Sequence, residues 1–194
     1  MKRTGLIRLG GLAAMVGGVA FVAGQVESEF LGLGTLAGAL LVLGAMAAVA
    51  ALHALQRTHY GLPGALASLA AFVGLVMLFV WLIETFMENS DMPLPPLLVS
   101  LYFFYNPFFG VSVATTGIIA LAAVTRVTGM LPWWCVAALI AGSPLISVLL
   151  MLFSALLLGE WGRGDFLLAV PWIVVGSAVF RAATRQAQQP ARVR

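Results

Sequence analysis

The sequence contains one compact group of carboxylates whose spacing could support chemistry: Glu84, Glu88 and Asp91. Side chains at this spacing share one helix face, so the three would gather if the preceding helix continued past Ile83. Acidic groups at a helix C-terminus oppose the helix dipole, so a divalent cation or a basic partner surface would stabilise them. With such a metal they could act on a lipid head group. A solvated helix end explains the same pattern without any ligand, and we favour that interpretation.

The two histidines, His53 and His59, are separated from these carboxylates by an apolar segment, residues 62–83. A helix of that length crosses the roughly 30 Å hydrocarbon core of a membrane, which would place histidines and carboxylates at opposite faces. Acid–base pairs and zinc sites need their side chains within bonding distance of one another. The single cysteine, Cys135, also excludes an internal disulfide and a multi-thiolate metal site. We therefore expect no metal, no cofactor and no catalytic residue, and the sequence favours a protein that is not an enzyme.

The composition determines which kind of fold must position these residues. Hydrophobic residues make up 62% of the 194 residues and charged residues only 9%. A soluble domain carries about 25% charged residues, so the composition predicts an all-α, polytopic membrane bundle instead. We expect a single integral membrane domain, residues 1–194, with six transmembrane helices, of which the last is the shortest. The predicted spans are residues 9–26, 30–52, 62–83, 97–124, 131–157 and 166–180.

The charged residues between these spans predict the orientation of the chain. Basic residues concentrate in the cytoplasmic loops of membrane proteins. With six spans and both termini cytoplasmic, every basic residue except Arg163 falls on the cytoplasmic side and all seven acidic residues fall outside. Residues 181–194 then form a basic cytoplasmic tail, which would contact anionic lipid. Much alanine, glycine and arginine with a single lysine points to a multi-pass protein of a bacterial plasma membrane.

The fourth and fifth predicted spans carry polar side chains in place of charged ones. In the fourth span, polar and aromatic side chains recur on one helix face, and Asn106 precedes a proline. Pro107 and Pro144 would interrupt the hydrogen bonding of the two spans. Two kinked helices with polar faces could enclose a cavity for a neutral solute, although such residues also bond neighbouring helices without any ligand. The candidate cavity-lining residues are Tyr102, Tyr105, Asn106, Ser112, Thr116, Ser143 and Ser147.

Two further groups of residues are candidates for contacts with other proteins. Arg57 and Arg126 lie in predicted cytoplasmic loops, where a partner subunit could dock. Gly34 and Gly38 form a pair of small residues one turn apart, which would let another helix approach closely. Residues 1–24 are also rich in glycine, which favours a retained first span over a cleavable signal peptide.

No predicted span contains an aspartate, glutamate, lysine, arginine or histidine near its middle, and this argues against several transport mechanisms. Ion-coupled transporters and voltage sensors place such side chains within the membrane. Nucleotide-binding and nucleic-acid-binding motifs are missing as well. The leading expectation is a membrane-embedded component of a transport assembly for a neutral or weakly polar small substrate, without its own energy source. The alternatives are a structural or regulatory subunit of a larger membrane complex, and a lipid-active intramembrane enzyme that uses the outer carboxylates.

Overall fold

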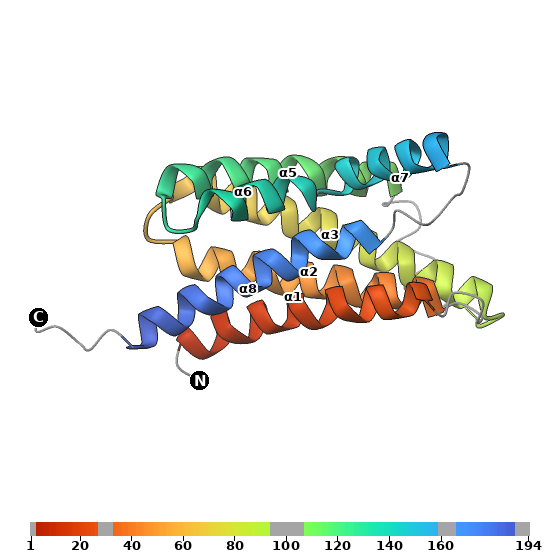
Figure 1. Ribbon diagram of the computed structural model, residues 1–194, viewed down its shortest axis with the longest axis horizontal. Helices are drawn as coiled ribbons and strands as arrows, with labels where there is room; N and C mark the ends of the chain where they lie inside the picture. The colour runs from red at the N-terminus through yellow and green to blue at the C-terminus, as the bar shows by residue number, and fades with distance from the viewer. Residues whose placement is uncertain (1–2, 27–32, 94–106, 159–165, 189–194) are drawn as a thin grey trace, which may run out of the picture.

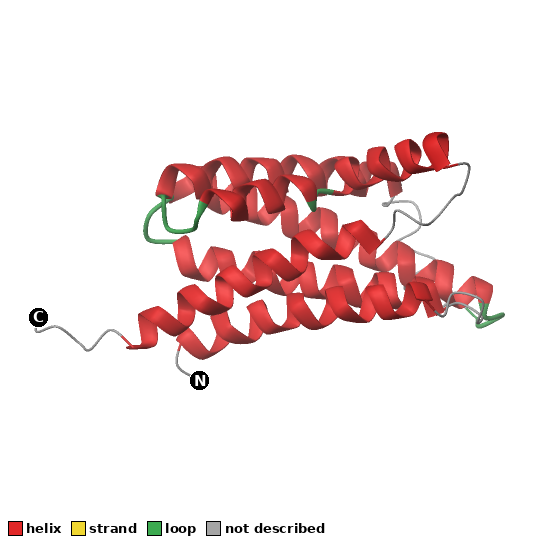
Figure 2. Cartoon of the chain, in the orientation of Figure 1, coloured by secondary structure: helices red, strands yellow, loops and turns green. Residues whose placement is uncertain are grey.

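The fold is known from a computed structural model, which describes residues 3–26, 33–93, 107–158 and 166–188. In these residues the regular structure is entirely helical, with seven helices and no strand (Figures 1 and 2). The helices are α1 (Arg3–Val26), α2 (Leu33–Gln56), α3 (Gly61–Asn89), α5 (Pro107–Thr128), α6 (Trp133–Ala141), α7 (Pro144–Leu158) and α8 (Phe166–Gln188).

Five of these helices, α1, α2, α3, α5 and α8, are long and apolar enough to cross a membrane. Large apolar side chains cover their outward faces; Leu69 of α3 is 59% exposed and Phe108 of α5 is 79% exposed. A soluble monomer rarely exposes an apolar surface of this extent, whereas lipid tails cover it at no cost. The predicted helical fold is therefore confirmed for the described residues, and the length and composition of the five helices indicate a multi-pass membrane protein.

The structure differs from the predicted fifth and sixth spans. The fifth predicted span is divided into α6 and α7, because Pro144 starts a new helix. Pro107 is the first residue of α5, where its missing N–H costs nothing, and residues 97–106 of the predicted fourth span lie outside the described residues. The short sixth span belongs to a helix of 23 residues that accommodates Pro171 and continues past Arg181 to Gln188.

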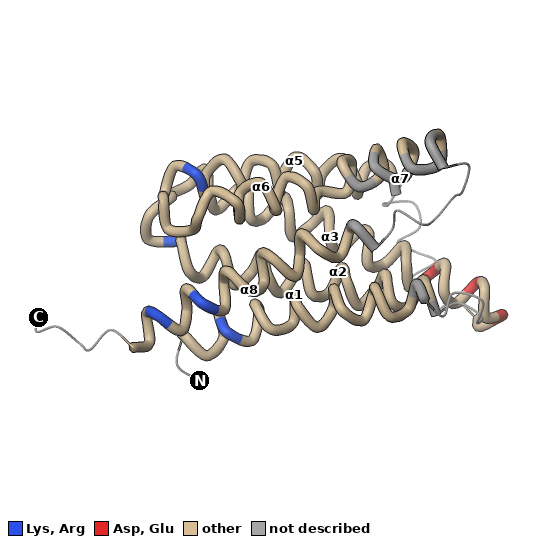
Figure 3. Tube along the Cα trace, viewed as in Figure 1, with Lys and Arg blue, Asp and Glu red and all other residues tan. Residues whose placement is uncertain are grey.

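Charge separates along the long axis of the bundle. Among the described residues, Figure 3 shows the arginine positions at one end and the aspartate and glutamate positions at the other. The start of α1, the turn from α2 to α3 and the ends of α5 and α8 form the first end, which we call the basic end (Figure 1). The acidic end is formed by the end of α3, with Glu84, Glu88 and Asp91.

The helices pack most extensively in two groups, which we call the α1–α2–α8 unit and the α3–α5 unit. Glycine allows the backbones to touch within each unit. A methyl group added at Gly17 of α1 would lie 2.5 Å from the carbonyl oxygen of Leu40 of α2. One added at Gly117 of α5 would collide with the backbone nitrogen of Ala71 of α3. Such approach is the usual basis of tight helix association in lipid, where no hydrophobic force draws helices together.

Gly34 and Gly38, the predicted packing pair, are not the glycines that bring the described helices together. A methyl group added at Gly34 would meet no atom within 4 Å. At Gly38 it would make an ordinary contact with Leu82, 3.6 Å away. The small-residue spacing identified helix α2 correctly as a packing helix, but it could not show which glycine faces a neighbour. Contact of Gly34 and Gly38 with another protein stays a prediction.

Candidate functional site

The most distinctive local structure in the described bundle is the break between α6 and α7. Pro144 has no backbone N–H, and its ring would clash with the carbonyl oxygen of Ile140 in a continuous helix. The chain therefore turns at Gly142 and Ser143 before α7 begins. The amide of Gly142 donates to the Ala138 oxygen at 2.8 Å, and the Ser143 hydroxyl donates to the Ile140 oxygen at 2.7 Å.

Two neighbouring helices supply partners for the backbone groups that the break leaves free. The amide of Leu145 donates to Oγ1 of Thr115 in α5 over 3.0 Å. The indole Nε1 of Trp172 in α8 donates to the carbonyl oxygen of Gly142 over 3.2 Å. Thr115 and Trp172 are 5% and 4% exposed. Because an unpaired backbone group is costly in hydrocarbon, these two side chains stabilise an interruption that lipid alone would not tolerate.

A cavity of about 170 Å³ lies beside this break. Gly142, Pro144 and Trp172 line it on one side, and residues of α2 and α3, including Ala45 and Leu78, line it on the other. None of its lining residues is charged. Its volume is close to that of the apolar protein cavity of about 150 Å³ that binds benzene. The cavity therefore suits a small, uncharged, mainly apolar molecule.

A second polar cluster occupies the turn between α2 and α3. Gly61 adopts a left-handed conformation with φ of 58°, and this folds Tyr60 back over α3. The Tyr60 hydroxyl lies 2.5 Å from Nδ1 of His53 and 3.2 Å from Oγ of Ser68. Burial raises the pKa of the Tyr60 hydroxyl, and the hydrogen bond with Ser68 lowers it to a smaller extent. The sequence indicated a polar loop here, but not that Tyr60 turns inward.

The candidate cavity-lining residues do not converge in the described structure. Ser112 and Thr116 are exposed on α5, and the Ser112 hydroxyl donates to the Phe108 oxygen of its own helix at 2.8 Å. Ser143 is buried at the break. Tyr102, Tyr105 and Asn106 lie outside the described residues, as does the side chain of Ser147.

The sequence pattern did not identify Thr115, the residue of α5 that accepts a hydrogen bond from the break. Thr115 bonds the break, whereas its neighbour Thr116, which shares the predicted polar face, points away from the bundle. Neighbouring helix positions differ by about 100° around the axis, so the choice of face decides which threonine is buried. The sequence did not indicate Trp172 either. Its position resembles that of a tryptophan at a membrane interface, but its side chain is buried.

The charged candidates lie at the two ends of the bundle. Arg57 and Arg126 are both exposed at the basic end, where they are accessible to a partner. At the acidic end Glu84 is buried, whereas Glu88 and Asp91 are exposed. Within the described residues, no three histidine, cysteine, aspartate or glutamate side chains are placed to hold a metal ion.

No protein family model, no curated protein and no solved structure matches this chain.

Proposed function

We propose that this chain is a membrane-embedded component of a transport assembly and that it binds a neutral, mainly apolar small molecule at the α6–α7 break. The observation that carries the proposal is the uncharged cavity of about 170 Å³ beside an interrupted helix. Transporters commonly form substrate sites at discontinuous helices, since non-helical backbone within a membrane is tolerated where it lines a cavity. The chain contains no nucleotide-binding motif, and no residue that lines the cavity carries a charge. Another subunit or the substrate gradient would therefore drive transport.

The proposed topology has six spans, with α6 and α7 together forming the fifth, and both termini in the cytoplasm of a bacterium. The separation of charge in Figure 3 supports it, because basic residues remain on the cytoplasmic side of bacterial membrane proteins. Arg57 and Arg126 would then face the cytoplasm and contact an energy-supplying partner.

Cysteine labelling tests the topology. Cys135 is the single cysteine, so a Cys135→Ser background permits one new exposed cysteine at a time. In intact cells a membrane-impermeant maleimide is expected to label Ser90→Cys at the acidic end and to spare Thr58→Cys at the basic end. Permeabilised cells should label both variants. Labelling of Thr58→Cys in intact cells would overturn the proposed orientation.

The binding proposal is tested by identifying the small molecules that copurify with the protein. Val148 lines the cavity and is 41% exposed, so Val148→Phe should narrow the cavity with little effect on packing. The next residue, Leu149, is 51% exposed and is not part of the cavity lining, which makes Leu149→Phe the matched control. We expect a bound molecule in the wild-type and control proteins and its loss from Val148→Phe.

The same purification distinguishes the transport role from the structural alternative. A copurifying ATPase or transport subunit would support the proposal. Copurification with respiratory, secretion or cell-envelope subunits, and equal small-molecule content in all three proteins, would favour a structural or regulatory subunit and contradict substrate binding.

A further inference from the structure

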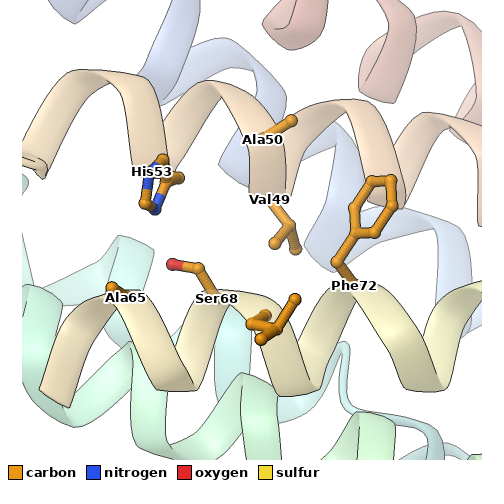
Figure 4. A pocket seen from close by; sticks show the side chains of 7 residues that line it. Val49, Ala50, His53, Ala65, Ser68 and Phe72 are labelled. Atoms are coloured by element: carbon orange, nitrogen blue, oxygen red, sulfur yellow. The ribbon is translucent and has the colours of Figure 1, made fainter. Parts of the chain in front are cut away.

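A second cavity, of about 250 Å³, lies between α2 and α3 close to the basic end. Its walls are apolar and come from Val49 and Ala50 of α2 and from Ala65, Leu69 and Phe72 of α3 (Figure 4). Ala50, Leu69 and Phe72 are exposed on the outside of the bundle. The cavity is therefore a groove that opens toward lipid, and we call it the α2–α3 groove.

The α2–α3 groove has one polar end. His53 and Ser68 are its only polar lining residues, and Figure 4 shows their side chains facing each other across it. The Ser68 hydroxyl donates to the Gly64 oxygen at 2.9 Å, and the Tyr60 hydroxyl lies within hydrogen-bond distance of both the Ser68 hydroxyl and Nδ1 of His53. This chain of hydrogen bonds fixes the imidazole and the hydroxyl in place, whatever occupies the groove.

A cationic side chain follows directly beyond this polar end. The amide of Arg57 donates to the His53 oxygen at 2.9 Å, so the helical path of α2 continues and Arg57 lies one turn after His53 on the same side. Arg57 is exposed, at the end of the bundle where membrane head groups would lie. No described acidic residue lies at this end to neutralise it.

We infer that the α2–α3 groove binds one acyl chain of an anionic phospholipid, whose phosphate lies at Arg57. The apolar walls accept the chain, the polar end at His53 and Ser68 coincides with the ester and head-group region, and the charge of Arg57 selects an anionic head group. The distance from Val49 to Arg57 along α2 is about 12 Å, enough for part of one chain. This inference requires the basic end to meet a bilayer interface, but it does not depend on a substrate at the α6–α7 break.

The inference is tested by native mass spectrometry of the delipidated protein, titrated with phosphatidylglycerol or phosphatidylcholine of identical acyl chains. We expect a single preferred adduct with phosphatidylglycerol. Arg57→Gln should weaken it about fivefold, since a basic residue near an anionic head group contributes about 1 kcal/mol. Arg185→Gln, which removes an exposed arginine at the basic end of α8, is the charge control and should leave that preferred adduct unchanged.

A bulky residue in the groove provides the second part of the test. Ala50→Trp should abolish binding of the preferred phosphatidylglycerol, whereas Ala123→Trp, at an exposed alanine of α5, should not. If Ala50→Trp fails to fold, Leu69→Gln changes an exposed groove residue and should weaken the same adduct. Equal binding of both lipids by the wild-type protein, or equal losses in Arg57→Gln and Arg185→Gln, would overturn the inference.

Discussion

Helices pack more closely within each of the two units than at the boundary between the units. Within the α1–α2–α8 unit and the α3–α5 unit, glycines such as Gly17 and Gly117 bring backbone atoms into direct contact. At the boundary, α2 and α3 pack less extensively, and the proline break lies beside a cavity that residues of both helices line. The α2–α3 groove lies between these two helices, and the cavity at the break lies where α2 and α3 face α7, α8 and the break.

This difference has a simple physical origin. Small residues let two helices gain van der Waals contact over their whole length, and they leave no room for a ligand. Where these glycine contacts are missing or the backbone is interrupted, helices do not interlock in this way, so space remains, and polar groups near it must find partners on other helices. Binding sites in this protein are therefore expected where the glycine contacts end.

The largest expected effect comes from disrupting a glycine contact inside a unit. Gly117→Val would place side-chain atoms against the backbone of Ala71, which cannot move aside as a side chain can. We expect the free energy of unfolding to fall by about 3 kcal/mol or more. Thermal unfolding in detergent measures this change. Gly34→Val, where the added group meets open space, is the control and should leave the midpoint nearly unchanged.

A smaller effect is expected at the boundary, from the side chain that bonds the break. Thr115→Val removes the acceptor of the Leu145 amide and should cost about 1 kcal/mol, within the range measured for hydrogen bonds between membrane helices. Thr115→Ser should restore most of the loss. The neighbouring exposed residue provides the control Thr116→Val, which we expect to be neutral. Equal effects of Thr115→Val and Thr116→Val would show that Thr115 does not stabilise the break.

The smallest effect concerns the titration of Tyr60. Burial raises its pKa above the ordinary value of 10.0, so its neutral form stabilises the fold below pH 10 and this contribution disappears as the pH rises through the raised pKa. The chain has three tyrosines, so the double variant Tyr102→Phe, Tyr105→Phe leaves Tyr60 alone. Absorbance of the phenolate should then titrate above pH 10 in the folded protein and near 10 in the unfolded one. Identical midpoints would contradict the burial of Tyr60.

The sequence predicted the helices better than their contacts. Apolar length and the positions of charged residues located five of the eight ends of α1, α2, α3 and α8 to within four residues; the other three ends extend six to eight residues beyond the predicted spans. These signals reflect whether a segment lies in lipid or in water, and the amino-acid composition of the segment itself reports this. The division of the fifth span was visible only as Pro144, because residues on both sides of it are equally apolar.

The site was less predictable, because hydrogen bonds between helices depend on rotation about each helix axis. The spacing of polar residues could not distinguish Thr115, which bonds the break, from Thr116, which is exposed. Likewise, Gly34 fits a packing motif as well as Gly17 does, and only the opposing helix distinguishes them. The assignment of Tyr102, Tyr105 and Asn106 to a cavity stays a prediction.

The central claim, that the cavity at the α6–α7 break binds a neutral molecule, is tested most directly through Trp172, which lines it. Protein labelled with 5-fluorotryptophan gives separate fluorine resonances, and Trp172→Phe identifies the relevant one. On titration with hexanol we predict a saturable shift of the Trp172 resonance that is lost in Val148→Phe, kept in Leu149→Phe and absent from the exposed Trp81. A Trp172 shift that grows linearly alongside that of Trp81, or no shift at all, would contradict binding in the cavity.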